Sequence, residues 1–229
     1  MRQAIILCSG GIDSTVTAYY VAKKENYSSL ILLFFNYDQR SHEAEKTCAH
    51  YTAQEIKAQF TELALPELSK LSTSLINKSS PHNPIEKTDL KDTKEESKNW
   101  YVPARNLLFL SYALALAEKE YKEKEIISDI FIGFKHEGKD WYLDATPEFL
   151  EKMNSISSTS LSTPLTIKAP LIDKDKEDII SLGTELGINF QKTHSCYTAN
   201  IHCGTCLACQ LRKQAFYWTN LKDPTTYQK

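Results

Sequence analysis

The sequence predicts an α/β fold with a doubly wound, mostly parallel sheet, and two observations support this prediction. Apolar runs of strand length alternate along the chain with segments of helical periodicity, which is the pattern of consecutive βαβ units. The run at residues 30–35 (Leu-Ile-Leu-Leu-Phe-Phe) is apolar at every position, as expected of a parallel strand covered on both faces. A chain of 229 residues is long enough for one large domain with a complete core.

The expected elements follow each other in strand–helix order. Strands are expected at residues 3–8, 30–35, 59–63, 126–133 and 166–169. Helices are expected at residues 14–24, 41–58, 107–118, from Pro147 onward, and 175–186. Pro147 suits the first position of a helix because its missing N–H is not needed there, and Gly187 suits a left-handed C-cap.

Residues 66–99 differ in composition from the rest of the chain, because Ser, Lys, Asp, Asn and Pro dominate there. This segment is either a solvated surface insertion or an active-site lid, since long loops in compact domains are often functional. Both hold if the segment orders only when a ligand binds. We therefore expect one domain over residues 1–190, with this polar insertion, and a C-terminal segment 191–229 packed on it.

Composition narrows the function classes. Lys and Arg total 27 against 29 Asp and Glu, a formal net charge of −2, which argues against a broad nucleic-acid-binding surface. No apolar run approaches the ~20 residues needed to cross a bilayer, and residues 5–8 are too short for a signal peptide. We expect a cytoplasmic protein without membrane contact. Its six cysteines are interpreted as metal ligands or free thiols rather than disulfides.

A candidate phosphate-binding loop follows the first predicted strand. Two glycines and three hydroxyl residues stand between that strand and a helix, so unpaired backbone N–H groups and the positive end of the helix dipole meet at one place. A Walker loop requires Lys where Asp13 stands, and a dinucleotide-binding loop requires a third glycine. A plain glycine turn is the alternative. The candidate pyrophosphate-binding residues are Ser9, Gly10, Gly11, Asp13, Ser14 and Thr15.

This loop resembles the SGGxDS loop of the ATP pyrophosphatases. In those enzymes the loop binds the pyrophosphate of ATP while an acid is adenylated. The resemblance implies ATP as the ligand.

A second constellation lies near the C-terminus, where three cysteines have C-x2-C-x2-C spacing and a fourth stands seven residues upstream. Four thiolates at about 2.3 Å close a tetrahedral shell around zinc, and such a closed site is structural. An iron–sulfur cluster is the alternative, but the Cys-Pro that would follow is missing. The predicted zinc ligands are Cys196, Cys203, Cys206 and Cys209.

Two histidines beside the cluster and two cysteines elsewhere in the chain are not expected to bind this metal. His194 and His202 flank the cluster and are interpreted as surface residues or as supports of the ligands, because four sulfurs complete the shell. Cys8 and Cys48 are interpreted as buried structural thiols.

With the phosphate loop and the cysteine cluster together, the chain resembles the 7-cyano-7-deazaguanine synthase (QueC) family over nearly its full length. The resemblance implies the PP-loop fold, which is adenine nucleotide alpha hydrolase-like. The matching segments beyond the loop are Tyr37-Asp38-Gln39-Arg40, Tyr101-Val102-Pro103-Ala104-Arg105-Asn106, Pro170-Leu171 with Lys176, Ser195-Cys196-Tyr197, Cys203 to Cys209, Leu211-Arg212 and Ala215-Phe216.

The resemblance also implies a reaction. The family activates 7-carboxy-7-deazaguanine as an acyl-adenylate, forms an amide with ammonia, and removes water after a second ATP activation to leave a nitrile. Mg²⁺ would neutralise the departing pyrophosphate, with Asp13 near the metal or capping the helix. Arg40 is the further candidate for ATP and pyrophosphate, and the candidate catalytic residues are Arg105, Lys176 and Asp144. Surface ion pairs are the alternative for Arg40, Arg105 and Lys176.

The chain departs from the family pattern at a few positions. The acidic residue expected five positions after Gly133 is Gly138, and Glu137 or Asp140 would substitute only if the loop is re-registered. Without a base there, the reaction would stop at the amide, or the activated acyl group would pass to another amine, including one on a protein. QueC-like relatives in bacterial antiphage (CBASS-type) systems suggest this second outcome. The other departures are Asp38 and Ala104 in place of glycines, and Ala145 and Thr146 after the matching Tyr142 and Asp144.

The sequence therefore supports three hypotheses for the function. The first is an ATP-dependent C–N ligase that uses ammonia, and the second is its divergent form with a stop at the amide or a protein acceptor. The third is a zinc-ribbon module that binds nucleic acid, against which the balanced charge and the intact phosphate loop argue. We expect a homodimer in each case.

Overall fold

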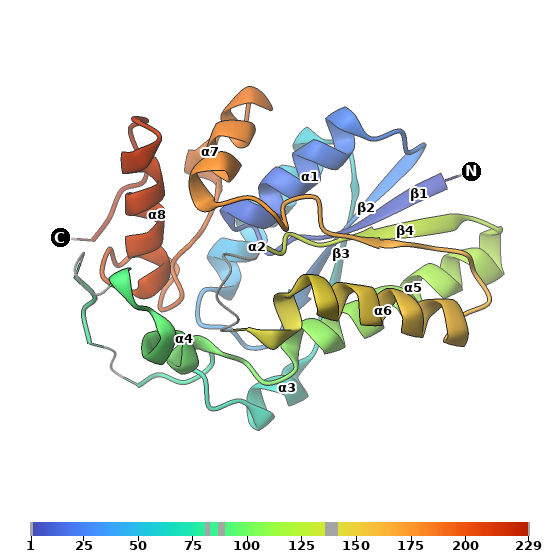
Figure 1. Ribbon diagram of the computed structural model, residues 1–229, viewed down its shortest axis with the longest axis horizontal. Coiled ribbons are helices and arrows are strands. Elements are labelled where there is room, and N and C mark those ends of the chain that lie inside the picture. Colours follow the sequence, from blue (N-terminus) through green and yellow to red (C-terminus); the bar gives the residue numbers. More distant parts are fainter. Residues whose placement is uncertain (1, 81–82, 87–89, 136–141, 229) are drawn as a thin grey trace.

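The computed structural model describes residues 2–80, 83–86, 90–135 and 142–228. At its centre is a parallel sheet in the order β3-β2-β1-β4-β5 (Figure 1). The chain therefore leaves β1 in one direction for β2 and β3 and in the other for β4 and β5, which confirms the predicted doubly wound parallel fold. The strands are β1 (Arg2–Leu7), β2 (Ser29–Asn36), β3 (Gln59–Ala64), β4 (Ile127–Phe131) and β5 (Ile167–Lys168).

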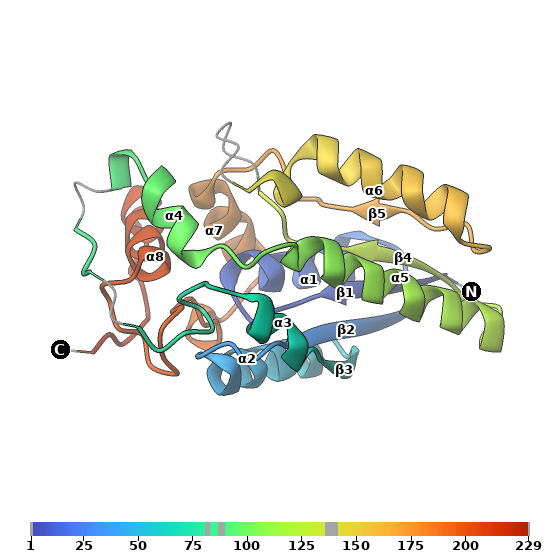
Figure 2. The same cartoon turned by 90° about the horizontal axis from the view of Figure 1, so that it is seen from below.

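Helices cover both faces of the sheet (Figures 1 and 2). Helices α1 and α2 pack on one face, and α5 and α6 pack on the other. The helices are α1 (Ile12–Lys24), α2 (His42–Glu55), α3 (Pro66–Leu71), α4 (Lys94–Trp100), α5 (Arg105–Lys124), α6 (Pro147–Ser160), α7 (Lys176–Glu185) and α8 (Leu207–Trp218). Short 3-10 turns occupy Leu143–Ala145 and Phe190–Lys192.

Successive residues of β1 alternate between these two layers. Ile5 and Leu7 pack with residues of α5, whereas Ala4 and Ile6 pack with residues of α1 and α2. Side chains of a strand point to opposite faces in turn, and here both faces are covered. This is why the run at residues 30–35 is apolar throughout.

The predicted element ends shift by a few residues. Helix α1 begins at Ile12, two residues earlier than expected, because Gly11 is its N-cap. Helix α5 continues to Lys124, six residues beyond the predicted end, and Glu125 closes it with a left-handed φ of 57°. Pro147 opens α6 and Gly187 follows α7 with a φ of 72°, both as predicted.

The described parts of the insertion at residues 66–99 are packed rather than freely solvated. Leu68, Ile76 and Ile85 are buried in the same cluster as β1 and α5, together with Trp100, which directly follows the insertion. The N–H of Leu75 also donates to the carbonyl of Asn99 at 2.9 Å, which joins the two sides of the insertion. The sequence did not reveal this packing because isolated apolar residues in a polar background have no helical or strand period.

The C-terminal segment shares its core with the main sheet domain. Phe216 of α8 packs with Ile12 of α1 and Ile179 of α7, while the cysteine region joins the cluster around α5. The division of the chain at residue 190 stays a prediction. In the described part of the chain, no helix combines the length and the apolar character needed to span a bilayer.

Candidate nucleotide site and metal centre

The predicted phosphate loop lies where the strand order reverses, between the carboxyl ends of β1 and β4. Gly10 has a φ of 76°, and a Cβ on it would collide with the Glu45 carbonyl oxygen. A Cβ on Gly133, beyond β4, would lie 3.0 Å from the Ser14 nitrogen. The loop is therefore held between α2 and the end of β4, at the crevice where α/β sheets bind ligands.

The N-terminus of α1 presents free hydrogen-bond donors at this crevice. Its N-cap is Gly11, which has no side chain that could cap the helix, so backbone N–H groups of the first turn remain for a ligand. The Ser14 hydroxyl accepts from the Ser9 N–H at 3.2 Å and lies 3.2 Å from the Ser9 hydroxyl. Thr15 is only 2% exposed, so of the three predicted hydroxyls those of Ser9 and Ser14 are at the loop surface.

Lys176 lies against the same loop. Its Nζ donates to both carboxylate oxygens of Asp13 at 2.6 Å. Lys176 begins α7, whose N-terminus is capped by the Asp175 side chain through the Asp178 N–H at 2.8 Å. Lys176 and the start of α7 therefore lie beside the phosphate loop, with the Lys176 charge paired with Asp13.

Arg105, the first residue of α5, forms a second cationic centre. Its Nη1 donates to the Tyr37 hydroxyl at 3.4 Å, and no carboxylate of the described residues forms an ion pair with it. Burial raises the pKa of the Tyr197 hydroxyl; the charge of Arg105 opposes that shift and the charge of Asp13 adds to it. The charges of Arg105 and of Asp13 in the phosphate loop therefore both act on Tyr197.

Asp144 supports the start of α5. Its Oδ2 accepts from the Asn106 N–H at 3.2 Å, and its carbonyl accepts from the Asn106 amide at 3.1 Å. The neighbouring Tyr142 donates its hydroxyl to the Ser97 carbonyl at 3.0 Å. The Leu143–Ala145 turn is thus attached both to α5 and to the insertion, beside Arg105.

Arg40 lies elsewhere. Its guanidinium donates to the carbonyls of Leu75 at 3.5 Å and Lys78 at 3.4 Å, and its N–H donates to the Ile76 carbonyl at 2.9 Å. These bonds hold the insertion against the end of β2. Arg40 makes no hydrogen bond to residues 9–15, so the structure does not bring it together with the phosphate loop as it does Lys176.

The four predicted metal ligands form one cluster, with their sulfurs all within 4.8 Å of one another. A tetrahedral zinc site with Zn–S bonds of about 2.3 Å needs sulfurs roughly 3.8 Å apart, so the donor set fits zinc. The N–H groups of Thr205 and Cys206 point at the Cys203 sulfur at 3.5 and 3.3 Å. Metal binding requires these sulfurs as thiolates.

The two histidines beside the cluster form hydrogen bonds with the backbone. His202 Nε2 accepts from the Ser195 N–H at 3.1 Å, and His194 Nε2 lies 3.0 Å from the Ala199 carbonyl. Their rings are 4.5 Å apart. Among the described residues, the candidate metal group consists of cysteines alone.

All six cysteines have free thiols. Cys8 is buried and Cys48 is half-buried, and burial raises the pKa of the Cys48 thiol to about 11. The prediction of a buried thiol thus holds fully for Cys8 and only in part for Cys48.

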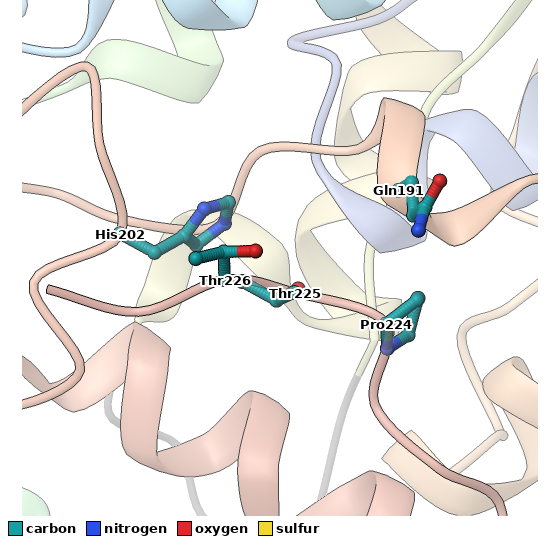
Figure 3. A pocket seen from close by; sticks show the side chains of 5 residues that line it. All are labelled: Gln191, His202, Pro224, Thr225 and Thr226. Atoms are coloured by element: carbon teal, nitrogen blue, oxygen red, sulfur yellow. The ribbon is translucent and has the colours of Figure 1, made fainter.

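A separate hollow of about 260 Å³ lies on the C-terminal segment (Figure 3). It is lined by Gln191, His202, Pro224, Thr225 and Thr226. None of the residues predicted to bind the nucleotide or the substrate lines it. The predicted acidic position at Gly138, and its substitutes Glu137 and Asp140, lie outside the described residues.

Comparisons with known proteins identify the family. Among solved structures, a U34-tRNA thiolase from Methanococcus maripaludis with its [4Fe-4S] cluster is similar, with a TM-score of 0.46 and 16% identity over 96% of this chain and 64% of that one. Two 7-cyano-7-deazaguanine synthases are similar in sequence: one from Nitratiruptor at 37% identity over 99% of both chains, and one from Rickettsia felis at 34% over 99% of this chain and 100% of that one. A family model described as "Queuosine biosynthesis protein QueC" matches residues 3–220.

The chain belongs to the QueC family. The predicted family is confirmed, and with it the prediction that the chain is an enzyme. At two departures from the QueC pattern, the structure has a left-handed backbone conformation. Asp38 and Ala104, which stand where the family resemblance places glycines, have left-handed φ values of 58° and 53°.

Sequence reasoning gave no role to several residues around the candidate site. Tyr37 and Tyr197 were quoted as parts of motifs without a role, yet both surround Arg105. The buried Arg212 likewise appeared only as part of Leu211-Arg212, although its guanidinium donates four hydrogen bonds to residues between 190 and 223. These residues could have been singled out because they lie inside segments that match the family. Such a match does not show which other residues they contact.

Proposed function

We propose that this chain uses ATP to adenylate 7-carboxy-7-deazaguanine and joins the activated carboxyl carbon to ammonia, giving 7-cyano-7-deazaguanine through the amide. QueC membership and the names of the relatives support this proposal. The observation that carries it is the uncapped N-terminus of α1 at the strand-order reversal, with Lys176 bound to Asp13 beside it. Helix N-termini of this kind bind phosphate groups.

The pyrophosphate half of ATP fits the phosphate loop. Backbone N–H groups at the start of α1 and the hydroxyls of Ser9 and Ser14 would donate to its oxygens. Lys176 would share its charge between Asp13 and the phosphates, and Asp13 is our candidate for the Mg²⁺ that accompanies ATP. These groups are fixed before the ligand arrives, which is the arrangement that stabilises developing negative charge most effectively.

Arg105 is our candidate for binding the acid. A carboxylate oxygen attacks the α-phosphorus of ATP and pyrophosphate leaves; the nitrogen of ammonia then attacks the acyl carbon, and AMP leaves with loss of a proton. In the second round the amide oxygen attacks another α-phosphorus, pyrophosphate leaves again, and loss of AMP and two protons gives the nitrile. We assign Arg105 to the negative charge of the carboxylate and the acyl phosphate. Asp144 positions the start of α5 through Asn106.

The test is pyrophosphate release from ATP. We expect release that depends on 7-carboxy-7-deazaguanine, and a nitrile when ammonium is supplied. Mass analysis of the product decides between the nitrile enzyme and its divergent form, since the amide alone or a deazaguanine adduct on a protein would replace the first by the second. No release with any deazaguanine acid would overturn the enzyme and leave the zinc-ribbon module.

Zinc, oligomeric state and location complete the proposal. We propose one structural Zn²⁺ on Cys196, Cys203, Cys206 and Cys209, which would fix the fold of the C-terminal segment. Metal analysis should find one zinc per chain, and iron in its place would contradict this assignment. We further propose a cytoplasmic homodimer, which sedimentation at micromolar concentration and cell fractionation would check.

A further inference from the structure

The C-terminal segment touches the phosphate loop directly. The N–H of His194 donates to the Gly10 carbonyl at 2.8 Å. Gly10 has no freedom on its other side, because a Cβ there would already collide with α2. The position of residue 194 therefore bears on the conformation of the loop from Ser9 to Thr15.

Residues on both sides of His194 are bound by one buried guanidinium. Arg212 of α8 is 0% exposed. Its Nη1 donates to the hydroxyls of Thr193 at 2.8 Å and Ser195 at 3.1 Å, and its Nη2 donates to the Phe190 carbonyl at 2.8 Å. Asp223 accepts from its Nε at 3.2 Å, so the buried charge is paired and its hydrogen bonds are directional.

The metal ligands hold the same stretch from the other side. Cys196 directly follows Ser195. Cys206 is the N-cap of α8 and Cys209 lies in its first turn, three residues before Arg212. A metal bound to these sulfurs would fix the distance between residue 196 and the start of α8, and so the reach of Arg212 to Thr193 and Ser195.

A second contact runs from the metal loop to the helix behind the phosphate loop. The Asn200 side chain accepts from the Ala44 N–H in the first turn of α2, at 3.2 Å. The Glu45 carbonyl of the same turn is the group that excludes a Cβ at Gly10. Gly10 is therefore contacted on one side by His194, two residues before Cys196, and on the other by the turn of α2 that binds Asn200, which lies between Cys196 and Cys203.

We propose that Arg212 and the cysteine cluster form a brace that holds the phosphate loop in its binding conformation, so that metal occupancy and nucleotide affinity are linked. Arg212 is a positioning residue in this proposal, acting through Thr193, Ser195 and the His194 N–H. The inference rests on the proposed function insofar as the loop must bind the phosphates of ATP.

Linkage sets the size and the sign of the effect. If loss of the metal lowers the population of the binding-competent loop to about one tenth, the affinity for ATP falls about tenfold. By reciprocity, saturating ATP must then raise the affinity for the metal by the same factor. A metal that only stabilised a remote segment would show neither effect.

The experiment measures Zn²⁺ transfer from the full chain to a chromogenic chelator, with and without a non-hydrolysable ATP analogue. Binding of the analogue to the zinc-loaded protein is measured by calorimetry. We expect the wild-type chain to bind zinc about tenfold more tightly with the analogue. Equal zinc affinity with and without the analogue, in a chain that binds the analogue, would overturn the brace. A wild-type chain that binds no analogue would instead refute the proposed function.

Two variants locate the linkage. Arg212→Gln removes the charge and most of the donors, and we expect about tenfold weaker binding of the analogue and no effect of the analogue on zinc. The matched control is Asp129→Asn, which alters another buried ionic residue, 1% exposed, outside the brace; it should keep both the affinity and the linkage. Amide exchange at residues 9–14 should rise in the first variant only. If Arg212→Gln does not fold, Arg212→Lys and the wild-type measurement decide, and linkage that survives in a folded Arg212 variant would refute the role of Arg212.

Discussion

Charged side chains at the two ends of the parallel sheet differ in how many protein partners they have. Toward the amino ends of the strands, Asp129 of β4 accepts from the Tyr27 hydroxyl at 2.7 Å and from the Thr166 N–H at 2.8 Å, and it pairs with Arg2. Lys168 lies 3.8 Å from the same carboxylate. Both carboxylate oxygens of Asp129 are therefore supplied with donors from the chain itself.

At the carboxyl ends, Arg105 and the start of α1 have fewer protein partners than Asp129 has. Arg105 has a tyrosine hydroxyl at 3.4 Å and no ion pair with a described carboxylate, and the first turn of α1 has no side-chain cap. Burial raises the pKa of the Tyr37 hydroxyl, which keeps that partner neutral, and the nearby charge of Asp144 acts on Arg105 without a direct ion pair. The amino end is therefore built for stability, and the carboxyl end retains donors for an anionic ligand.

The largest expected effect tests the amino end. Asp129→Asn leaves Arg2, Tyr27 and Lys168 without their shared anion, and breaking a buried pair of this kind costs about 3 kcal/mol of unfolding free energy. Denaturant titration measures this loss. Affinity for ATP should stay within twofold of the wild type, and a large loss of affinity would contradict the separation of the two ends.

The next effect tests the carboxyl end. Arg105→Lys keeps a positive charge but loses the planar fork that binds a carboxylate or phosphate with two hydrogen bonds. We expect kcat/KM for 7-carboxy-7-deazaguanine to fall about 100-fold, with the unfolding free energy nearly unchanged. Arg40→Lys is the control, because Arg40 holds the insertion; it should cost less than tenfold. A larger loss in the control than in Arg105→Lys would reverse the assignment of these two residues.

A smaller effect tests strain at the start of α5. Ala104 has a φ of 53°, and the left-handed conformation costs an alanine roughly 1–2 kcal/mol. Ala104→Gly relieves this cost, but glycine also raises the conformational entropy of the unfolded chain, which offsets part of the gain. We therefore expect stabilisation of about 0.5–1 kcal/mol. Ala115→Gly, at an exposed position inside the same helix, should destabilise by about 1 kcal/mol. Destabilisation by both changes would show that Ala104 is not strained.

The smallest effect is expected at Asp38. Its φ is 58°, but Asp tolerates this conformation better than Ala, and its carboxylate accepts from the Ser69 hydroxyl at 2.8 Å. Asp38→Gly removes that hydrogen bond and also relieves the backbone strain. The melting temperature should therefore change by less than it does in Ala104→Gly. An equal gain from both substitutions would mean that the Ser69 bond contributes nothing.

The sequence determined the features that a short stretch of chain builds by itself. The phosphate loop from Ser9 to Thr15, the spacing of the four cysteines, and the alternation of strands and helices all depend on neighbours within a few turns. Local hydrogen bonding and periodicity set such features, which is why their prediction agreed with the structure. The family also followed from these segments and their order.

Only the tertiary structure decided which distant side chains meet. Arg40 and Arg105 both stand in segments that resemble the family, with the weaker match around Arg40. In the structure Arg40 donates to the carbonyls of Leu75 and Lys78, while Arg105 donates to the Tyr37 hydroxyl. The contact of His194 with Gly10 and the burial of Arg212 are likewise set by the packing of α8 on α7 and α1. Long-range contacts of this kind depend on how whole elements pack, and no local pattern in one chain records that packing.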